Sequence, residues 1–77
     1  SSPSLKGDII EMTERVAATI AGEYASPDTP AEEWSWEAIG DATFKAFNLR
    51  LQLDEEARAK MTERDLEAAI VEAALAS

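Results

Sequence analysis

The sequence contains no cysteine and no histidine. Without cysteine, neither a disulfide framework nor a thiolate zinc site can form. Without histidine, the chain lacks the most common general base and the most common metal ligand of proteins. Catalysis would have to rely on carboxylates, lysines or hydroxyls alone. We therefore expect no catalytic, cofactor-binding or metal site in this chain.

Positive charge is also scarce, since 7 lysines and arginines stand against 16 aspartates and glutamates, for a net charge of −9. This charge repels nucleic acids and anionic membrane surfaces, so we expect no nucleic-acid binding and no direct membrane binding. No apolar run approaches the roughly 20 residues that a membrane-spanning helix requires. The polar start, residues 1–7, lacks the apolar region of a secretory signal, so a cytoplasmic location is expected.

Aromatic residues are few, and both tryptophans and both phenylalanines lie between residues 34 and 47. Aromatic side chains bury the most area per residue, so a small domain should build its core around this stretch. Ser35 is placed as the N-cap of a helix, with Trp34 and Ile39 as its hydrophobic staple. A left-handed Asn48 should end this helix. The predicted core residues of the helix are Trp36, Ile39, Phe44 and Phe47.

A first amphipathic helix is predicted from residue 9 to about residue 24, begun by an acidic capping box at Asp8. Apolar residues recur every three or four positions along it, and Val16 and Ile20 are predicted to face the core. A proline-containing turn over residues 26–30 should end the helix, because proline cannot donate a backbone hydrogen bond.

After the aromatic helix, leucines alternate with polar residues over residues 49–53, the pattern of an extended segment with one buried face. A lone strand has no pairing partner, so we expect an extended Leu-rich strap between helices two and three instead of a sheet. Asp54 should cap a short third helix. Thr62 and Asp65 have the spacing of a capping box for a last helix over residues 63–76.

The last helix is apolar on two sides. Leu66 and Ile70 form the face that is predicted to join the core, and Val71 and Leu75 lie on a second face. A helix that is apolar on two sides usually packs against more than its own small domain. Together with Trp34, Val71 and Leu75 are therefore the predicted partner surface. The elements predict one all-α domain over residues 1–77, a small antiparallel assembly of three to four helices.

An acidic run and a serine at a helix start could in principle form a metal site or an attachment site. The densest acidic run, residues 54–56, lacks the spacing and the central glycine of a calcium loop, and a capped, solvated helix start explains it better. Acyl carrier proteins are also short, acidic and helical, and they attach phosphopantetheine to a serine at a helix start. Ser35 has that position, but the Asp-Ser-Leu motif is missing. A stand-alone acidic helical module that binds other proteins is the remaining alternative.

Four segments, in order, resemble the helical wing domain of SecA, the preprotein translocase ATPase. Residues 5–8 are close to a Leu-x-Gly sequence that precedes the wing. Residues 33–39, Glu-Trp-Ser-Trp-Glu-Ala-Ile, resemble the Trp-Asp-Leu-Glu-Gly-Leu stretch that opens a helix in that family. Residues 47–51, Phe-Asn-Leu-Arg-Leu, stand where the family has Phe-Gly-Leu-Asp-Leu. Residues 61–66 are similar to the Leu-Thr-Glu-Glu-x-Leu opening of the family's returning helix.

The sequence departs from the family pattern at several positions. Ser35 replaces an aspartate, while Ala38 and Asn48 each replace a glycine. These substitutes can fill the same backbone roles. The Glu-Trp-Leu of the family's short third helix is missing, and Glu-Ala-Arg stands at residues 56–58 instead. The packing of this third helix therefore cannot be carried over from the family.

The resemblance implies a non-catalytic structural and interaction domain of a SecA-like protein translocation motor, with residues 1–25 as the end of a scaffold helix. In that family ATP and magnesium bind to other domains, so this chain should bind neither. The wing lies beside the clamp for unfolded preprotein. The implied partners are thus the other domains of the motor, including the preprotein-crosslinking domain, and unfolded preprotein. The parent would be peripheral at the cytoplasmic face of the membrane. Weak self-association of the isolated chain is also expected.

Overall fold

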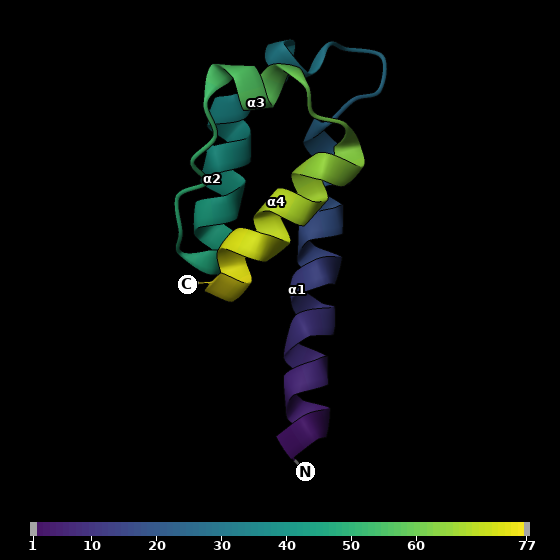
Figure 1. Cartoon of the computed structure of the whole chain (residues 1–77), viewed down its shortest axis with the longest axis vertical. Coiled ribbons are helices and arrows are strands. Elements are labelled where there is room, and N and C mark those ends of the chain that lie inside the picture. The colour runs from purple at the N-terminus through teal and green to yellow at the C-terminus, as the bar shows by residue number, and fades with distance from the viewer. Residues whose placement is uncertain (1, 77) are drawn as a thin grey trace.

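A computed structural model describes residues 2–76, with side chains described from residue 7 onward. Four α-helices and one short 3-10 helix follow one another: α1 (Ser2–Tyr24), η1 (Ala31–Glu33), α2 (Trp36–Phe47), α3 (Glu55–Ala59) and α4 (Glu63–Ala76) (Figure 1). No strand occurs within residues 2–76. The predicted all-α class is confirmed.

The first helix starts earlier than the sequence pattern suggested. α1 begins at Ser2 and continues through Asp8 without interruption, so the predicted capping box at Asp8 is wrong. Proline is tolerated in the first helical turn, and a single glycine at position 7 costs only about 1 kcal/mol, so nothing before Asp8 forces a stop. The end at Tyr24 agrees with the prediction, because the proline-containing turn follows.

The helix boundaries in the second half follow the predicted signals. Asn48 ends α2 in the left-handed region, with φ 57° and ψ 40°, and its N–H donates to the Phe44 carbonyl at 2.7 Å. The Asp54 carboxylate accepts from the Ala57 N–H at 2.8 Å. Thr62 and Asp65 make both bonds of the capping box, each 3.1 Å long. These three predictions are confirmed.

Residues 49–53 join α2 to α3 without regular secondary structure. Their three leucines are half-buried, and Arg50 and Gln52 between them are exposed. Leu51 packs against the core. We refer to residues 49–53 as the strap.

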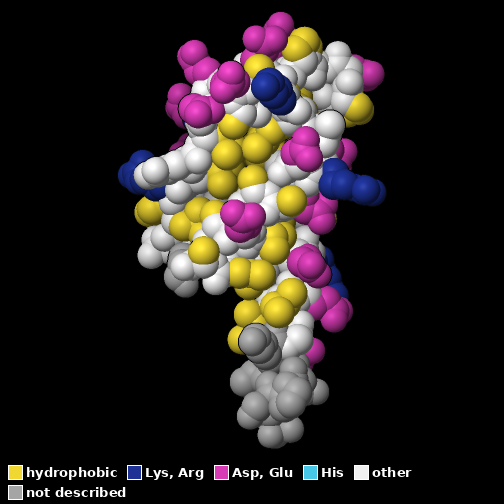
Figure 2. Space-filling view, in the orientation of Figure 1, with side chains coloured by type: hydrophobic (Ala, Val, Ile, Leu, Met, Phe, Trp, Pro, Cys, Tyr) yellow, Lys and Arg dark blue, Asp and Glu magenta, His cyan; other side chains and the backbone are white. Residues whose placement is uncertain are grey.

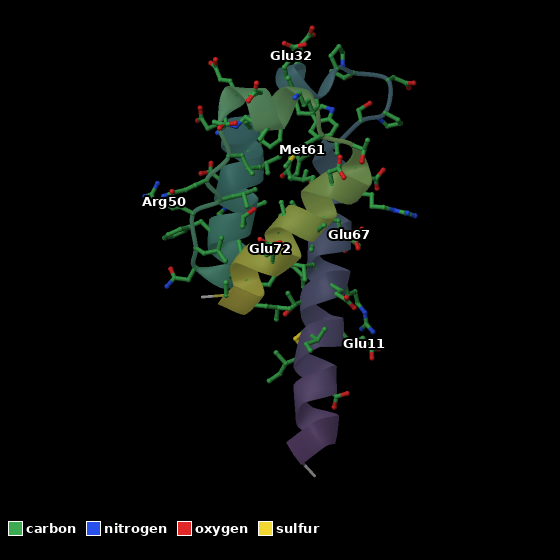
Figure 3. The ribbon with its side chains drawn as sticks, viewed as in Figure 1. Glu11, Glu32, Arg50, Met61, Glu67 and Glu72 are labelled. Atoms are coloured by element: carbon green, nitrogen blue, oxygen red, sulfur yellow. The ribbon has the colours of Figure 1, made fainter. Side chains whose placement is uncertain are left out.

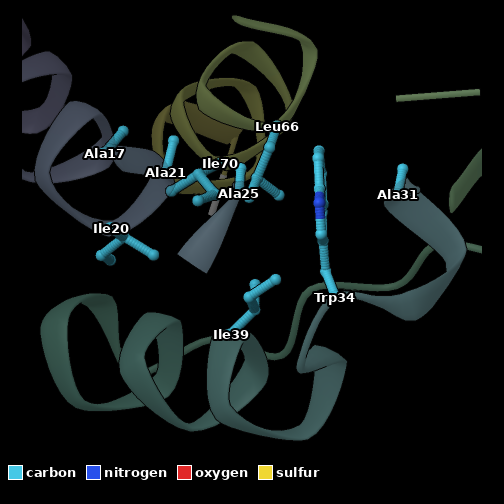
Figure 4. Packing of buried hydrophobic residues seen from close by; sticks show 9 residues of the cluster. All are labelled: Ala17, Ile20, Ala21, Ala25, Ala31, Trp34, Ile39, Leu66 and Ile70. Atoms are coloured by element: carbon cyan, nitrogen blue, oxygen red, sulfur yellow. The ribbon is translucent and has the colours of Figure 1, made fainter. Parts of the chain in front are cut away.

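The core lies where α4 and α2 meet one side of α1 (Figure 4). Ala17, Ala21 and Ala25 of the first helix and its end are almost fully buried, and their small side chains let α4 approach closely. Leu66 and Ile70 from α4 fill this contact, and both have no exposed surface. The buried apolar residues are Ala17, Ile20, Ala21, Ala25, Ala31, Trp34, Ile39, Leu66 and Ile70.

Not every predicted core residue lies in this cluster. Ile20, Ile39, Leu66 and Ile70 do, whereas Val16, Trp36 and Phe47 are partly buried and pack against its edge. Phe44 is 45% exposed, so its prediction as a core residue is wrong. It follows the buried Thr43 on α2, and one position along a helix is a rotation of about 100°, which turns its ring toward solvent. Arg50 covers the ring, with its guanidinium carbon 5.5 Å from the ring centre.

Candidate interaction surface

Trp34 belongs to the core and not to a partner surface. Its side chain is only 7% exposed, so the prediction that it contacts a partner is wrong. The indole Nε1–H donates to the carbonyls of Ser26 and Thr29, both at 3.1 Å. Both carbonyls belong to the connection between α1 and α2 and accept from the same N–H. Through these two hydrogen bonds, Trp34 stabilises the turn that connects α1 to α2.

Trp36 is the more accessible of the two tryptophans. Its Nε1–H donates to the Ala31 carbonyl at 2.9 Å, and the Arg58 guanidinium carbon lies 5.1 Å from the ring centre. An arginine over an indole face is a favourable cation–π pair. Trp36 and Arg58 thereby connect η1 to α3, two elements that pack together.

Beside this pair lies an open pocket of about 440 Å³, lined by Trp36 and Arg58 and by Glu32, Glu33 and Glu55. Acidic side chains cover this end of the molecule (Figure 2). Within the described part of the chain, no carboxylate forms a salt bridge with Arg58, and its buried Nε has no hydrogen-bond partner.

The two predicted partner residues of α4 have different environments. Val71 is half-buried and packs against the core, at a small depression that Glu14, Arg64 and Glu67 also line. Leu75 is 47% exposed near the end of the helix. Only Leu75 presents apolar surface to solvent in the way that the two-sided pattern of α4 predicted.

Two further exposed apolar side chains lie on α1. Ile9 is 54% exposed and Met12 is 65% exposed, although both continue the stripe that includes Val16 and Ile20. The helix extends past the rest of the molecule, as Figure 1 shows. We call Ile9 and Met12 the α1 end patch.

The way in which α4 crosses α1 explains why this patch is uncovered. α4 begins beside the C-terminal part of α1 and runs obliquely away from it toward α2 (Figure 1). The buried residues of α1, Ala17, Ile20 and Ala21, therefore lie in its C-terminal part, and Ile9 and Met12 lie outside the contact.

Ser35 precedes α2, but its side chain makes no capping hydrogen bond, so this part of the prediction is wrong. Instead, the Trp36 N–H donates to the Trp34 carbonyl at 2.9 Å, and the Ser35 carbonyl accepts from Ile39. Among the side chains described, no group of three or more acidic residues is placed to hold a metal ion. No helix in the described part of the chain is long and apolar enough to cross a membrane.

Two curated proteins are similar to the chain in sequence. The protein translocase subunit SecA of Pelobacter propionicus is 36% identical over 70 residues, which cover 91% of this chain and 8% of that protein. The same subunit from Geotalea uraniireducens is 29% identical over 52 residues, 68% of this chain and 6% of that protein. The resemblance to SecA is confirmed. The chain thus spans less than a tenth of the length of the SecA proteins that it matches.

No family model matches the chain, and no solved structure matches it significantly. The similarity to SecA therefore rests on sequence alone. It nevertheless covers 91% of the chain.

Proposed function

We propose that this chain is a non-catalytic wing-like segment of a SecA-type protein translocation motor. The observation that carries the proposal is the match to SecA over 91% of the chain and 8% of the relative. A segment of that share is one structural part of a much larger protein. In the proposed assignment, residues 1–25 are the end of a scaffold helix, and the remaining elements form the wing that returns to it.

The α1 end patch supports this assignment. An apolar stripe that continues past its partner helix needs another surface to cover it, and Ile9 and Met12 are both more than half exposed here. In the proposed motor, a neighbouring domain covers them. The other domains, including the preprotein-crosslinking domain, are the primary partners, and unfolded preprotein passes nearby.

The chemistry of ATP hydrolysis belongs to other parts of the proposed parent, which would bind ATP and magnesium and act at the cytoplasmic face of the membrane. This chain contributes shape and contact surface. Trp34 stabilises the chain's own turn between α1 and α2, because its indole N–H donates to the carbonyls of Ser26 and Thr29. Such a rigid element transmits the position of one neighbouring domain to another.

A transplant tests the proposal. The 70 matching residues of the Pelobacter propionicus SecA would be replaced by the corresponding residues of this chain. The chimera should keep ATP-dependent preprotein translocation, because the proposed assignment gives the inserted segment the same place and the same neighbours in the motor. A matched chimera with Ile9→Gln and Met12→Gln should lose translocation efficiency while basal ATP binding is retained. A folded first chimera that binds ATP and translocates nothing would contradict the proposal.

A further inference from the structure

The strap shows the alternating burial of an extended segment with one buried face. Its leucines are half-buried, whereas Arg50 and Gln52 between them are exposed, so successive side chains point to opposite sides. In an extended segment the side chains point to two opposite faces. The backbone N–H and C=O groups point sideways, toward the two edges at which a neighbouring strand could pair. One edge of the strap borders a groove that α4 closes on the other side.

The backbone of the strap has no hydrogen-bond partner. No hydrogen bond among the described residues involves a main-chain N–H or C=O of residues 49–53. The neighbouring bonds stop at the Asn48 N–H and begin again with the Asp54 carbonyl. An extended backbone with free polar groups is a template for pairing with another extended segment.

The groove beside the strap has room for such a segment, with a volume of about 570 Å³. Leu51 and Leu53 line it from the strap, and Ala69 and Ala73 line it from α4. The small alanines leave space between the strap and the helix. Hydrophobic side chains gather in the middle of the face shown in Figure 2.

The charges around the groove select for a basic partner. Glu72 lines it from α4 and has no ion pair in the described part of the chain. Arg50, on the opposite wall, lies over the Phe44 ring. Figure 3 shows Arg50 and Glu72 on the two elements that border the groove. With a chain charge of −9, a peptide that carries lysines is attracted and an acidic one is repelled.

We propose that the strap pairs, edge to edge, with an extended peptide of alternating apolar and basic residues that lies in the groove between the strap and α4. Main-chain hydrogen bonds to residues 49–53 supply the pairing, the alanines of α4 receive the apolar side chains, and Glu72 attracts the basic ones. The proposal needs only this chain, so it stands independently of the proposed role in a translocation motor.

A peptide fits this groove better than a second copy of the chain does. The leucines of a second strap would already pack on their own helices, so its pairing would bring a whole second domain against α4. Two copies also carry −9 each and repel one another. A single extended peptide has neither obstacle.

The test is a nuclear magnetic resonance titration of the isotope-labelled chain with the peptide Leu-Lys-Leu-Lys-Leu-Lys-Leu. Amide shifts should concentrate in residues 49–53 and in the α4 residues of the groove. Within the strap, alternate amides should move most, because alternate N–H groups point to the same edge. The same peptide with its central backbone nitrogen methylated loses one donor and should bind less tightly.

Two matched variants separate the groove from general charge attraction. Glu72→Lys and Glu23→Lys change the net charge equally, but only Glu72 lines the groove. Glu72→Lys should weaken peptide binding by about tenfold, and Glu23→Lys by about twofold or less. Ala73→Trp, which fills the groove, should also abolish binding, whereas Ala18→Trp on the exposed side of α1 should not.

Three results would overturn the proposal. The first is an absence of shifts at millimolar peptide concentration. The second is an equal effect of the Glu72 and Glu23 substitutions, which would indicate binding by charge alone. The third is movement of the strap amides with chain concentration in the absence of peptide, which would identify a second copy as the occupant.

Discussion

The indole rings of Trp34 and Trp36 lie 5.6 Å apart, centre to centre, and their planes are inclined by 37°. Both rings donate to main-chain carbonyls of the connection between α1 and α2. Yet Trp34 is almost fully buried and Trp36 is only partly so. Trp34, which precedes α2, is therefore part of the core. Trp36, the first residue of α2, packs at the edge of the core.

This relationship predicts the order of two substitutions. Trp34→Ala should lower the free energy of unfolding by about 3–5 kcal/mol, because it removes a buried ring and leaves the Ser26 and Thr29 carbonyls without their donor. Trp36→Ala should cost about 1–2 kcal/mol, since part of its surface is already exposed. Chemical denaturation followed by helical circular dichroism measures both. A larger loss for Trp36→Ala would show that the roles are reversed.

The sequence pattern identified the staple position of Trp34 but not its burial. Periodicity within α2 favoured Trp36 as the core residue, because it compares only residues of the same helix. Trp34 lies outside that helix, and its burial depends on how residues 26–31 fold back over it. A long-range arrangement of this kind has no signature in local spacing.

The helix caps provide a second prediction. Asp54→Ala and Thr62→Ala should each destabilise the chain by about 0.5–2 kcal/mol, because both side chains accept a hydrogen bond from a helix N-terminus. Ser35→Ala should change stability by less than about 0.5 kcal/mol, since its side chain makes no capping bond. Thermal and urea denaturation of the three variants provide the comparison. A Ser35→Ala loss as large as that of Thr62→Ala would contradict the observed geometry.

The caps at Asp54 and at Thr62 and Asp65 were predictable because each side chain and its target amide are neighbours in sequence. Ser35 has the same local spacing, but its side chain makes no capping bond, so local spacing alone does not decide a cap. The start of α1 was not predictable in this way. A capping signal at Asp8 competes with continuation of the helix, and here continuation prevails.

A third prediction concerns the isolated chain at high concentration. The α1 end patch and Leu75 expose apolar side chains, so the chain should self-associate weakly at millimolar concentration. The double variant Ile9→Gln and Met12→Gln should reduce association while changing stability by less than about 1 kcal/mol. Val71→Gln should instead destabilise the fold, because Val71 packs against the core. Sedimentation equilibrium and denaturation separate the two effects.

If the double variant associates as strongly as the unmodified chain, the α1 end patch is not the contact surface. Leu75→Gln is the matched variant for that case, since Leu75 is 47% exposed near the end of α4. Of the predicted partner residues Trp34, Val71 and Leu75, Leu75 has the greatest exposure, and its contact with a partner stays a prediction. The second face of α4 faces the core at Val71 and solvent at Leu75.

The most direct measurement uses the absence of native cysteine in this chain. Met12→Cys places a single thiol on the α1 end patch, and Glu11→Cys places one on the exposed neighbouring position. Thiol labelling would be followed by mass spectrometry, in the isolated chain and in the SecA chimera. A covered patch should slow labelling at position 12 by about tenfold or more in the chimera, which corresponds to about 1.4 kcal/mol of protection. Labelling at position 11 should change much less. Equal labelling rates at position 12 in the two settings would contradict the assignment of this chain as a docked segment of the motor.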